Sequence, residues 1–338
     1  MKSSVAQIEA YYRAWQRALN QLVKDGLAAC LEEDIYLIGP NASQMASQRV
    51  KLTICVTLHG NEVAGIAALS QFVDMVAARL VTLPFVVGVT IGNLPAARRG
   101  ERFLERDLNR SFGSTSFTLQ EQRRAKVLQD TLLDRTDFLL DIHQTRLANQ
   151  TPFTIFPYTA QSLAFAALVC PGQPVVTHWG PSFSKEGLCS DEYVQVQGGQ
   201  GITVETGQAG FDPTQVSFGF SSMLRAICVL ERGEIGSAFG VTELAAVLQA
   251  TQTQVFSWAQ VVEFPEHRDI LLKPGLMNFS PVAAGEQLGV LAGEAFYAQQ
   301  AGAALFPIYP EQNSKTYHKP PREIIRLVKP ITIAQLPV

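Results

Sequence analysis

Short runs of β-branched and apolar residues alternate with longer amphipathic segments along most of the chain. This alternation is typical of an α/β protein, in which helices cover both faces of a sheet. We therefore expect an α/β fold with a mixed sheet flanked by helices. The predicted strands cover residues 35–38, 51–58, 85–91, 138–142, 154–156, 175–177 and 202–204, and the predicted helices cover residues 62–80, 119–133, 161–169 and 216–231.

The character of the sequence changes after about residue 250. From Val261 onward, short apolar pieces are separated by prolines and glycines, which favours a small β-rich domain with tight turns. The sequence thus predicts an α/β domain over residues 1–250 and a β-rich C-terminal capping domain over residues 251–338.

Composition excludes several classes of protein. The chain has 338 residues, 47% of them hydrophobic and 17% charged, which is incompatible with disorder. Its net charge of −3 provides no general basic field for a nucleic acid, and no apolar run approaches the roughly 18 residues of a membrane span. The five cysteines are scattered, and residues 1–24 are amphipathic rather than a signal peptide. We expect a cytoplasmic protein with reduced thiols that binds neither nucleic acid nor membrane.

A candidate metal site begins in the segment Thr57-Leu-His-Gly-Asn-Glu-Val-Ala-Gly65, where His59 ends a buried strand and a helix begins near Glu62. The spacing His-x-x-Glu lets a ring nitrogen and a carboxylate oxygen reach one zinc ion. A catalytic zinc needs a third ligand, and His143 ends another apolar strand. Because ligands gather at the carboxyl ends of strands in α/β sheets, the two histidines are expected to meet there. Each residue alone is also compatible with a helix cap or a core histidine.

Two carboxylates accompany these candidates. Asp141 lies two residues before His143 on the same strand face, where it could orient the imidazole or serve as a structural carboxylate. Glu205 ends the segment Gly201-Ile-Thr-Val-Glu205 before a run of turn residues. A carboxylate at a third strand end is placed to take a proton from water and pass it to a leaving amine. A helix cap or a surface acid is the open alternative for Glu205.

Five arginines and no lysine occur between residues 98 and 110. The planar guanidinium binds carboxylates through two hydrogen bonds, so this composition favours recognition of a small anion. The interleaved acids Glu101, Glu105 and Asp107 keep the local net charge low, which argues against contacts with a nucleic-acid backbone. A self-paired surface loop is the alternative.

Together these motifs resemble one family in content, order and spacing. They are His59-Gly-Asn-Glu62, the segment 102–112 with Asp107-Leu-Asn-Arg110, Asp141-Ile-His143 and Val204-Glu-Thr-Gly207. The family is that of the succinylglutamate desuccinylases and aspartoacylases, a branch of the zinc-carboxypeptidase fold. The resemblance covers roughly residues 50–210 strongly and the C-terminal part only in general character.

The resemblance implies a metal site. His59, Glu62 and His143 would bind one zinc ion per chain. We expect Asp107 and Asp141 to contact these ligands and orient them. It also implies a zinc-carboxypeptidase-like mixed sheet as the scaffold of that site.

The resemblance further implies how a substrate is bound and hydrolysed. Glu205 would be the general base, Asn109 and Arg110 would bind a substrate carboxylate, and Arg102 would polarise the scissile carbonyl. The implied activity is that of a zinc-dependent deacylase, which hydrolyses the amide bond of a small anionic N-acyl amino acid.

Two further residues of the family pattern are harder to match in this chain. Aspartoacylase-like sequences carry an arginine about ten residues before the general base, where it binds the carboxylate of the amino acid. Here no arginine lies between residues 146 and 225, which puts N-acetylaspartate in doubt as the substrate. The candidate replacement is Lys185 or His178, the latter because it ends a further predicted strand, and a structural or surface role is the open alternative for each. The family's C-terminal domain also supplies a tyrosine, for which Tyr317 is the best match and Tyr309 the alternative.

Basic residues recur between residues 315 and 329, among them Arg326. They could attract an anionic substrate, but the charges of a solvated edge strand explain them more simply.

Two other functions stay open. A carboxypeptidase with the same metal site would act on peptides, although a cap over the cleft suits small substrates better. A binding protein would keep the fold without turnover, but the ligands and the base are all present. No heptad pattern occurs, so the sequence predicts no particular oligomeric state.

Overall fold

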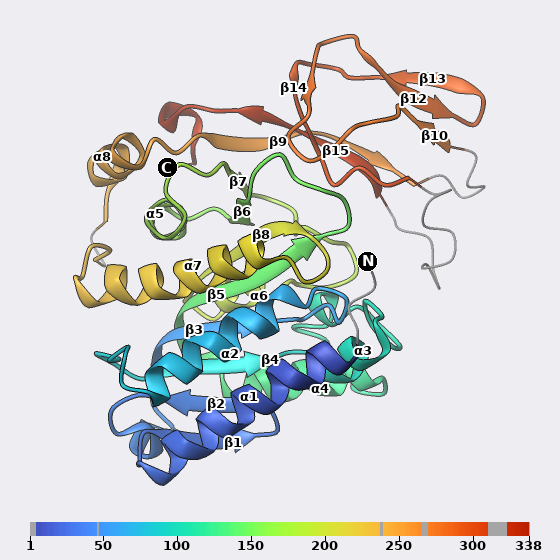
Figure 1. The fold of residues 1–338 in the computed structure, drawn as a ribbon. Helices are drawn as coiled ribbons and strands as arrows, with labels where there is room; N and C mark the ends of the chain where they lie inside the picture. The colour runs from blue at the N-terminus through green and yellow to red at the C-terminus, as the bar shows by residue number, and fades with distance from the viewer. Residues whose placement is uncertain (1–4, 46, 237–238, 265–269, 310–322, 338) are drawn as a thin grey trace.

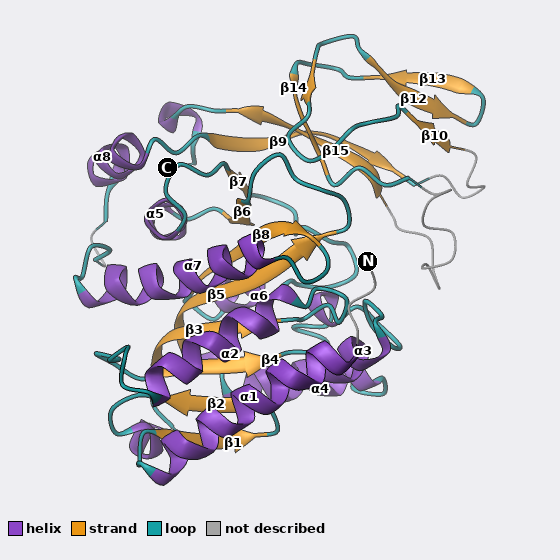
Figure 2. Cartoon of the chain, in the orientation of Figure 1, coloured by secondary structure: helices purple, strands orange, loops and turns teal. Residues whose placement is uncertain are grey.

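The computed structural model describes residues 5–45, 47–236, 239–264, 270–309 and 323–337. Its helices and strands form a mixed α/β fold with a β-rich C-terminal part, as Figure 2 shows. The predicted fold class is therefore confirmed. A 12-stranded sheet runs through the molecule in the order β1-β2-β4-β3-β5-β8-β6-β7-β9-β15-β14-β11.

Each predicted strand forms, with shifts of a few residues at the ends. They are β2 (Ile35–Ile38), β3 (Val50–Val56), β4 (Val87–Ile91), β5 (Thr136–Thr145), β6 (Phe153–Pro157), β7 (Val175–His178) and β8 (Gln200–Gln208). The strands β4, β3, β5 and β8 are parallel neighbours, so their carboxyl ends meet at one edge. The strand β6 is antiparallel to β8, and β7 is parallel to β6. The edge strand β1 (Ala28–Glu32) pairs with β2.

Helices cover both faces of this sheet, as seen in Figure 1. One face carries α1 (Val5–Lys24), α2 (Ala64–Ala77), α5 (Ala160–Val169), α7 (Pro213–Glu231) and α8 (Val241–Thr251), whose apolar sides form the largest core cluster. The other face carries α4 (Gln120–Thr131) and α6 (Ser190–Val196), which pack on a smaller cluster. The short helix α3 (Leu94–Arg99) follows β4 and contacts α1.

The C-terminal part extends the main sheet. The strand β9 (Val255–Glu263) pairs with β7, and the sheet continues through β15 (Glu323–Pro330), β14 (Gly302–Leu305) and β11 (Pro281–Val282). A second sheet of β10 (Ile270–Leu272), β12 (Gln287–Leu291) and β13 (Glu294–Tyr297) shares an apolar cluster with β15. The predicted division at residue 250 thus falls where the main sheet continues, and it stays a prediction.

The strand β15 corrects the explanation of Arg326, whereas the basic residues between 315 and 322 lie outside the described residues. It lies between β9 and β14 and is not an edge strand. Its Arg326 is only 2% exposed, so this guanidinium is not a solvated edge charge.

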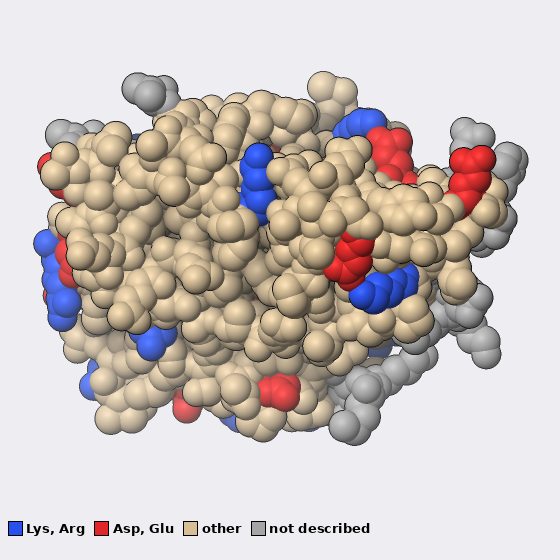
Figure 3. All heavy atoms as spheres, turned by 90° about the horizontal axis from the view of Figure 1, so that it is seen from above, with Lys and Arg blue, Asp and Glu red and all other residues tan. Residues whose placement is uncertain are grey.

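None of the helices in the described ranges is long and apolar enough to cross a membrane. On the face shown in Figure 3, the drawn Lys, Arg, Asp and Glu side chains are scattered over a mostly uncharged surface. All five cysteines are free.

The helix α2 follows the loop that carries His59 and Glu62. Its packing on the sheet depends on its buried apolar face. We expect Phe72→Ala, at a fully buried position of α2, to lower the free energy of unfolding by about 3–5 kcal/mol, because it removes apolar contacts and leaves a cavity. Phe117→Ala is the matched control, since Phe117 is 39% exposed, and it should cost well under half as much. Urea denaturation measures both, and equal losses would contradict this account of the core.

Candidate metal centre and substrate site

His59 and Glu62 lie in the loop between β3 and α2. Thr57 opens this loop with φ of 59°, in the left-handed region, and its hydroxyl donates to the Glu62 carbonyl at 3.1 Å. Gly60 packs so tightly on α3 that an added Cβ would lie 2.3 Å from the helix backbone. The helix itself begins at Ala64, two residues later than expected, so the Glu62 carboxylate projects from the loop.

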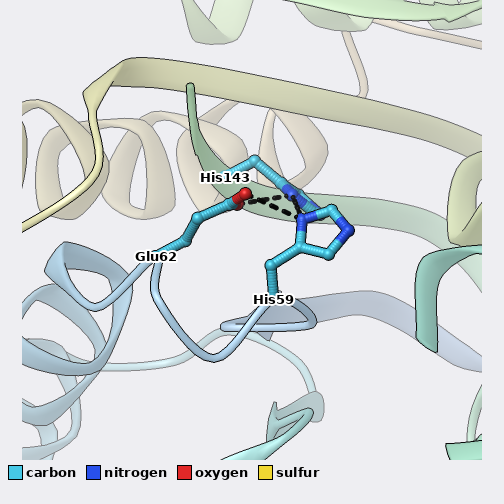
Figure 4. Close-up of side chains that lie close together, drawn as sticks. All are labelled: His59, Glu62 and His143. Carbon is cyan, nitrogen blue, oxygen red and sulfur yellow. Dashed lines mark hydrogen bonds and ion pairs between the residues drawn. The ribbon is translucent and has the colours of Figure 1, made fainter. Parts of the chain in front are cut away.

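Figure 4 shows the side chains of His59, Glu62 and His143 pointing toward one another. The imidazole Nδ1 atoms lie 2.8 Å from different oxygens of Glu62 and 3.1 Å from each other. Each of the three residues is at most 3% exposed. The parallel pairing of β3 with β5 therefore brings the three predicted ligands into one buried cluster, with ligand atoms within 4.8 Å of one another.

Carboxylates lie behind both imidazoles. His59 Nε2 is 3.0 Å from Asp107 Oδ1, and His143 Nε2 is 3.0 Å from Asp141 Oδ2. A proton on each Nε2 donates to the carboxylate, which leaves both Nδ1 lone pairs aimed at the same point. Two such nitrogens and a carboxylate are a donor set that suits Zn²⁺, so the residues present fit this ion.

Arg102 also reaches the cluster. Its Nη1 donates to Glu62 Oε1 at 3.0 Å, and its Nη2 lies 2.7 Å from His59 Nε2. A guanidinium only donates, so this contact and the Asp107 contact require opposite protonation of the same imidazole nitrogen. A cation bound by Nδ1 would require the proton on Nε2, and this protonation would favour the Asp107 contact over the Arg102 contact.

Glu205 lies on β8, directly opposite His143 in the register with β5. It is 8% exposed, and its Oε2 has no hydrogen-bond partner among the described residues. Burial, together with the negative charge of Glu62, raises the pKa of Glu205 to about 8. A carboxyl group with such a pKa exchanges protons readily near neutral pH.

The arginine-rich segment is held in place by a residue that the sequence patterns did not single out. Glu121, in the first turn of α4, is 1% exposed. Its carboxylate accepts hydrogen bonds from the backbone N–H groups of Leu104, Glu105 and Arg106 at 2.6–3.2 Å. Acids are common in first helical turns, so only its burial distinguishes Glu121.

Asn109 and Arg110 follow in the same segment and contact α6. Asn109 Oδ1 accepts a hydrogen bond from Ser190 N at 2.8 Å, and Arg110 Nη1 lies 3.0 Å from Cys189 Sγ. The Ser190 hydroxyl donates in turn to Asp141. The start of α6 therefore links the Asn109–Arg110 turn to Asp141, the carboxylate that contacts His143.

The strand-end argument for His178 fails. Because β7 runs antiparallel to β8, its carboxyl end lies at the sheet edge opposite to that of His143 and Glu205. The His178 imidazole is buried and stacks on Trp258, with ring centroids 4.2 Å apart. Burial, together with the charge of Arg326, lowers the pKa of His178 to about 3, so the ring is neutral. Its role in substrate binding stays a prediction that this geometry does not favour.

The other candidates for substrate contacts lie elsewhere. Lys185 is exposed and pairs with Glu263 at 2.8 Å. Tyr309 donates to the carbonyl of Lys273 at 2.7 Å within the C-terminal part. Tyr317 lies outside the described residues.

Known proteins resemble this chain in both sequence and fold. The model of the succinylglutamate desuccinylase/aspartoacylase catalytic domain matches residues 48–227. The chain is 33% identical to a succinylglutamate desuccinylase of Yersinia enterocolitica over 152 residues, which are 41% of this chain and 44% of that protein. The chain therefore spans less than half the length of this relative.

Solved structures share the fold over most of the chain. That of a succinylglutamate desuccinylase from Vibrio cholerae has a TM-score of 0.68 at 16% identity, and covers 89% of this chain and 86% of its own. The product-bound ectoine utilization protein of Ruegeria pomeroyi has a TM-score of 0.59 at 18% identity, and covers 87% and 88%.

These matches place the chain in the class of hydrolases, because the matching family model describes a catalytic domain of such enzymes and covers more than half of the chain. The chain belongs to the succinylglutamate desuccinylase/aspartoacylase family. The resemblance that the motifs predict is therefore confirmed.

The neutral, buried His178 makes a pH-dependent contribution to stability. The unfolded chain takes up a proton at this imidazole below pH 6.5, whereas the folded protein takes it up only near pH 3. Stability from the neutral ring is complete above pH 6.5 and is lost as the pH falls. Between pH 8 and pH 5, the free energy of unfolding of His178→Gln should fall by about 2 kcal/mol less than that of the wild type. Urea denaturation at the two pH values measures this difference. Parallel losses in both proteins would refute the depressed pKa.

Proposed function

We propose that the chain is a zinc-dependent deacylase that hydrolyses the amide bond of a small anionic N-acyl amino acid. The observation that carries this proposal is the convergence of two imidazole Nδ1 atoms and the Glu62 carboxylate, with the unpartnered Oε2 of Glu205 across the same strand pair. Family membership and a succinylglutamate desuccinylase among the relatives support this reaction class.

His59, Glu62 and His143 would hold the zinc ion, and Asp107 and Asp141 would fix the tautomer of the two imidazoles. When bound there, zinc supplies a Lewis acid that activates water and polarises a carbonyl. The low exposure of the three ligands keeps bulk water away, which strengthens electrostatic interactions in the cluster.

Glu205 would move the proton. It takes a proton from the attacking water as the bond from oxygen to the carbonyl carbon forms. It then gives this proton to the nitrogen as the carbon–nitrogen bond breaks.

Arg102 and the Asn109–Arg110 turn would bind negative charge. Arg102 lies beside Glu62, where its guanidinium can meet the charge that develops on the carbonyl oxygen. Arg110, held by Cys189 at the start of α6, would bind a carboxylate of the substrate.

Glu205→Gln tests the proton transfer directly. We expect the variant to retain zinc and to lose about 10²–10⁴-fold in kcat, because the amide cannot accept the proton. Activity is measured on N-acetyl and N-succinyl amino acids and on blocked dipeptides, and zinc by mass spectrometry. Glu234→Gln, at an exposed position paired with Arg232, is the matched control and should behave as the wild type.

The outcomes of this panel separate the possible functions. Near-normal hydrolysis by Glu205→Gln would remove Glu205 from its role. Preferential cleavage of blocked dipeptides by the wild type would favour a carboxypeptidase, and zinc binding without hydrolysis of any compound would favour a binding protein.

Metal removal tests the cluster independently of the base. Dialysis against a chelator should abolish hydrolysis and lower the melting temperature, because Glu62 and the two imidazoles then lose a shared cation. Added Zn²⁺ should restore both properties. His143→Ala should bind less than a tenth of the zinc of the wild type. Full activity of zinc-free protein would contradict the proposal.

A further inference from the structure

Gln144 follows His143 on β5, and the proposed mechanism gives this residue no role. It is only 2% exposed. Side chains alternate between the two faces of a strand, so Gln144 points away from the His143 imidazole and toward the first turns of α2 and α7. Buried amides are hydrogen-bonded, so the partners of this amide show which segments it joins.

Gln144 binds the segment that carries Glu62 at two points. Its backbone N–H donates to Glu62 Oε2 at 3.0 Å, and its side-chain Oε1 accepts a hydrogen bond from Ala64 N at 3.0 Å. Ala64 is the first residue of α2, and the preceding Val63 provides no side-chain hydrogen bond to the helix start. Gln144 therefore satisfies a backbone donor at the start of α2 and fixes the chain two residues after the candidate metal ligand.

The same amide binds the segment that follows Glu205. Its Nε2 donates to the carbonyls of Gln208 and Gly210 at 3.0 and 2.9 Å, and it also contacts Gln215 Oε1. Its Oε1 accepts a second hydrogen bond, from Gly210 N at 3.4 Å. The donors and the acceptor of this side chain are thus all used, and they join the start of α2 to the turn after β8.

The segment that Gln144 binds contains a bulge directly after Glu205. The strand β8 has one more residue than β5 between the pairs His143–Glu205 and Thr145–Gln208. Gly207 within the bulge has a φ of 145°, which favours glycine, and an added Cβ would lie 2.7 Å from a side chain of α7. A bulge redirects side chains next to it, so the shape of this bulge affects the direction of the Glu205 carboxylate.

We propose that Gln144 is a positioning residue that fixes the metal ligand Glu62 and the base Glu205 relative to each other, because one side chain binds the backbone after each of them. This inference rests on the proposed deacylase function. Strand pairing sets the place of Glu205 along β8, whereas the bulge sets its direction. The Oε2 atom of Glu205 has no hydrogen-bond partner among the described residues, which leaves the backbone to aim it.

Gln144→Met tests this role, because methionine has a similar length and makes none of these side-chain hydrogen bonds. The Kd for Zn²⁺, measured in competition with a chromophoric chelator, should rise by about 10- to 100-fold, as is typical when a group that orients a metal ligand is lost. The kcat for an N-acyl amino acid should fall by about 10- to 100-fold. Its KM should change by less than about threefold, because substrate binding is assigned to the Asn109–Arg110 turn.

Gln129→Met is the matched control for the loss of a buried amide. Gln129 is 7% exposed, accepts a hydrogen bond from Gly113 N at 3.2 Å and donates to the Tyr193 hydroxyl at 3.0 Å. The variant should lower the melting temperature and leave the Kd for Zn²⁺ and kcat unchanged. Equal losses of zinc affinity in the two variants would overturn the proposal, because destabilisation alone would then explain them.

Gln215→Met tests the bulge separately, and it decides the question if Gln144→Met does not fold. Gln215 contacts Gln144 and donates to the Gln208 carbonyl at 3.1 Å. The variant should lower kcat more than it weakens zinc binding. In the double variant, the loss in kcat should be smaller than the product of the two single losses, because both residues act through one bulge. An unchanged kcat in Gln215→Met, or independent losses in the double variant, would overturn the inference.

Zinc binding separates this inference from the deacylase proposal, because it requires no turnover. Wild-type protein that binds zinc and hydrolyses no compound would contradict the deacylase proposal. Weaker zinc binding by Gln144→Met, but not by Gln129→Met, would still support the positioning of Glu62. Unchanged zinc affinity and kcat in Gln144→Met would overturn the positioning role and leave the deacylase proposal standing.

Discussion

Everything at the candidate site depends on the parallel pairing of β5 with β3 on one side and β8 on the other. This pairing aligns the ends of three strands. Residues that are far apart in sequence therefore meet through strand pairing and do not depend on the conformation of long loops. His143 and Glu205 become direct neighbours, and the loop after β3 brings His59 and Glu62 to them. The buried cluster then acquires its protonation pattern from the carboxylates behind it.

The sequence predicted this arrangement where local patterns are sufficient. Strands, the His-x-x-Glu spacing and the histidine at the end of β5 are all visible in short windows, and parallel strands have only one way to place their ends. The strand-end argument for His178 does not hold because the direction of β6 relative to β8 is a property of the whole sheet, and no residue in β7 encodes it. Arg326 was taken for an edge charge because β9, which covers one side of β15, comes from a distant segment of the chain.

The continuous sheet also determines how the C-terminal part is attached to the α/β layer. The strand β9 pairs with β7 of the α/β layer, and β15 pairs with β9, so backbone hydrogen bonds tie this part directly to the scaffold. A cap attached only by a linker could move independently, whereas this part shares the twist of the main sheet. The aromatic cluster that includes Phe153 and Val328 is formed from both parts.

Glu121 has a consequence for how the chain tolerates change. Its carboxylate holds three successive backbone N–H groups, and none of these bonds involves the side chains of residues 104–106. The path of the loop before Asn109 and Arg110 is thus fixed in part from α4, outside the loop itself. These three bonds set no requirement on the side chains of residues 104–106, whereas the Arg106 side chain adds its own bonds to the carbonyls of Arg110 and Glu186.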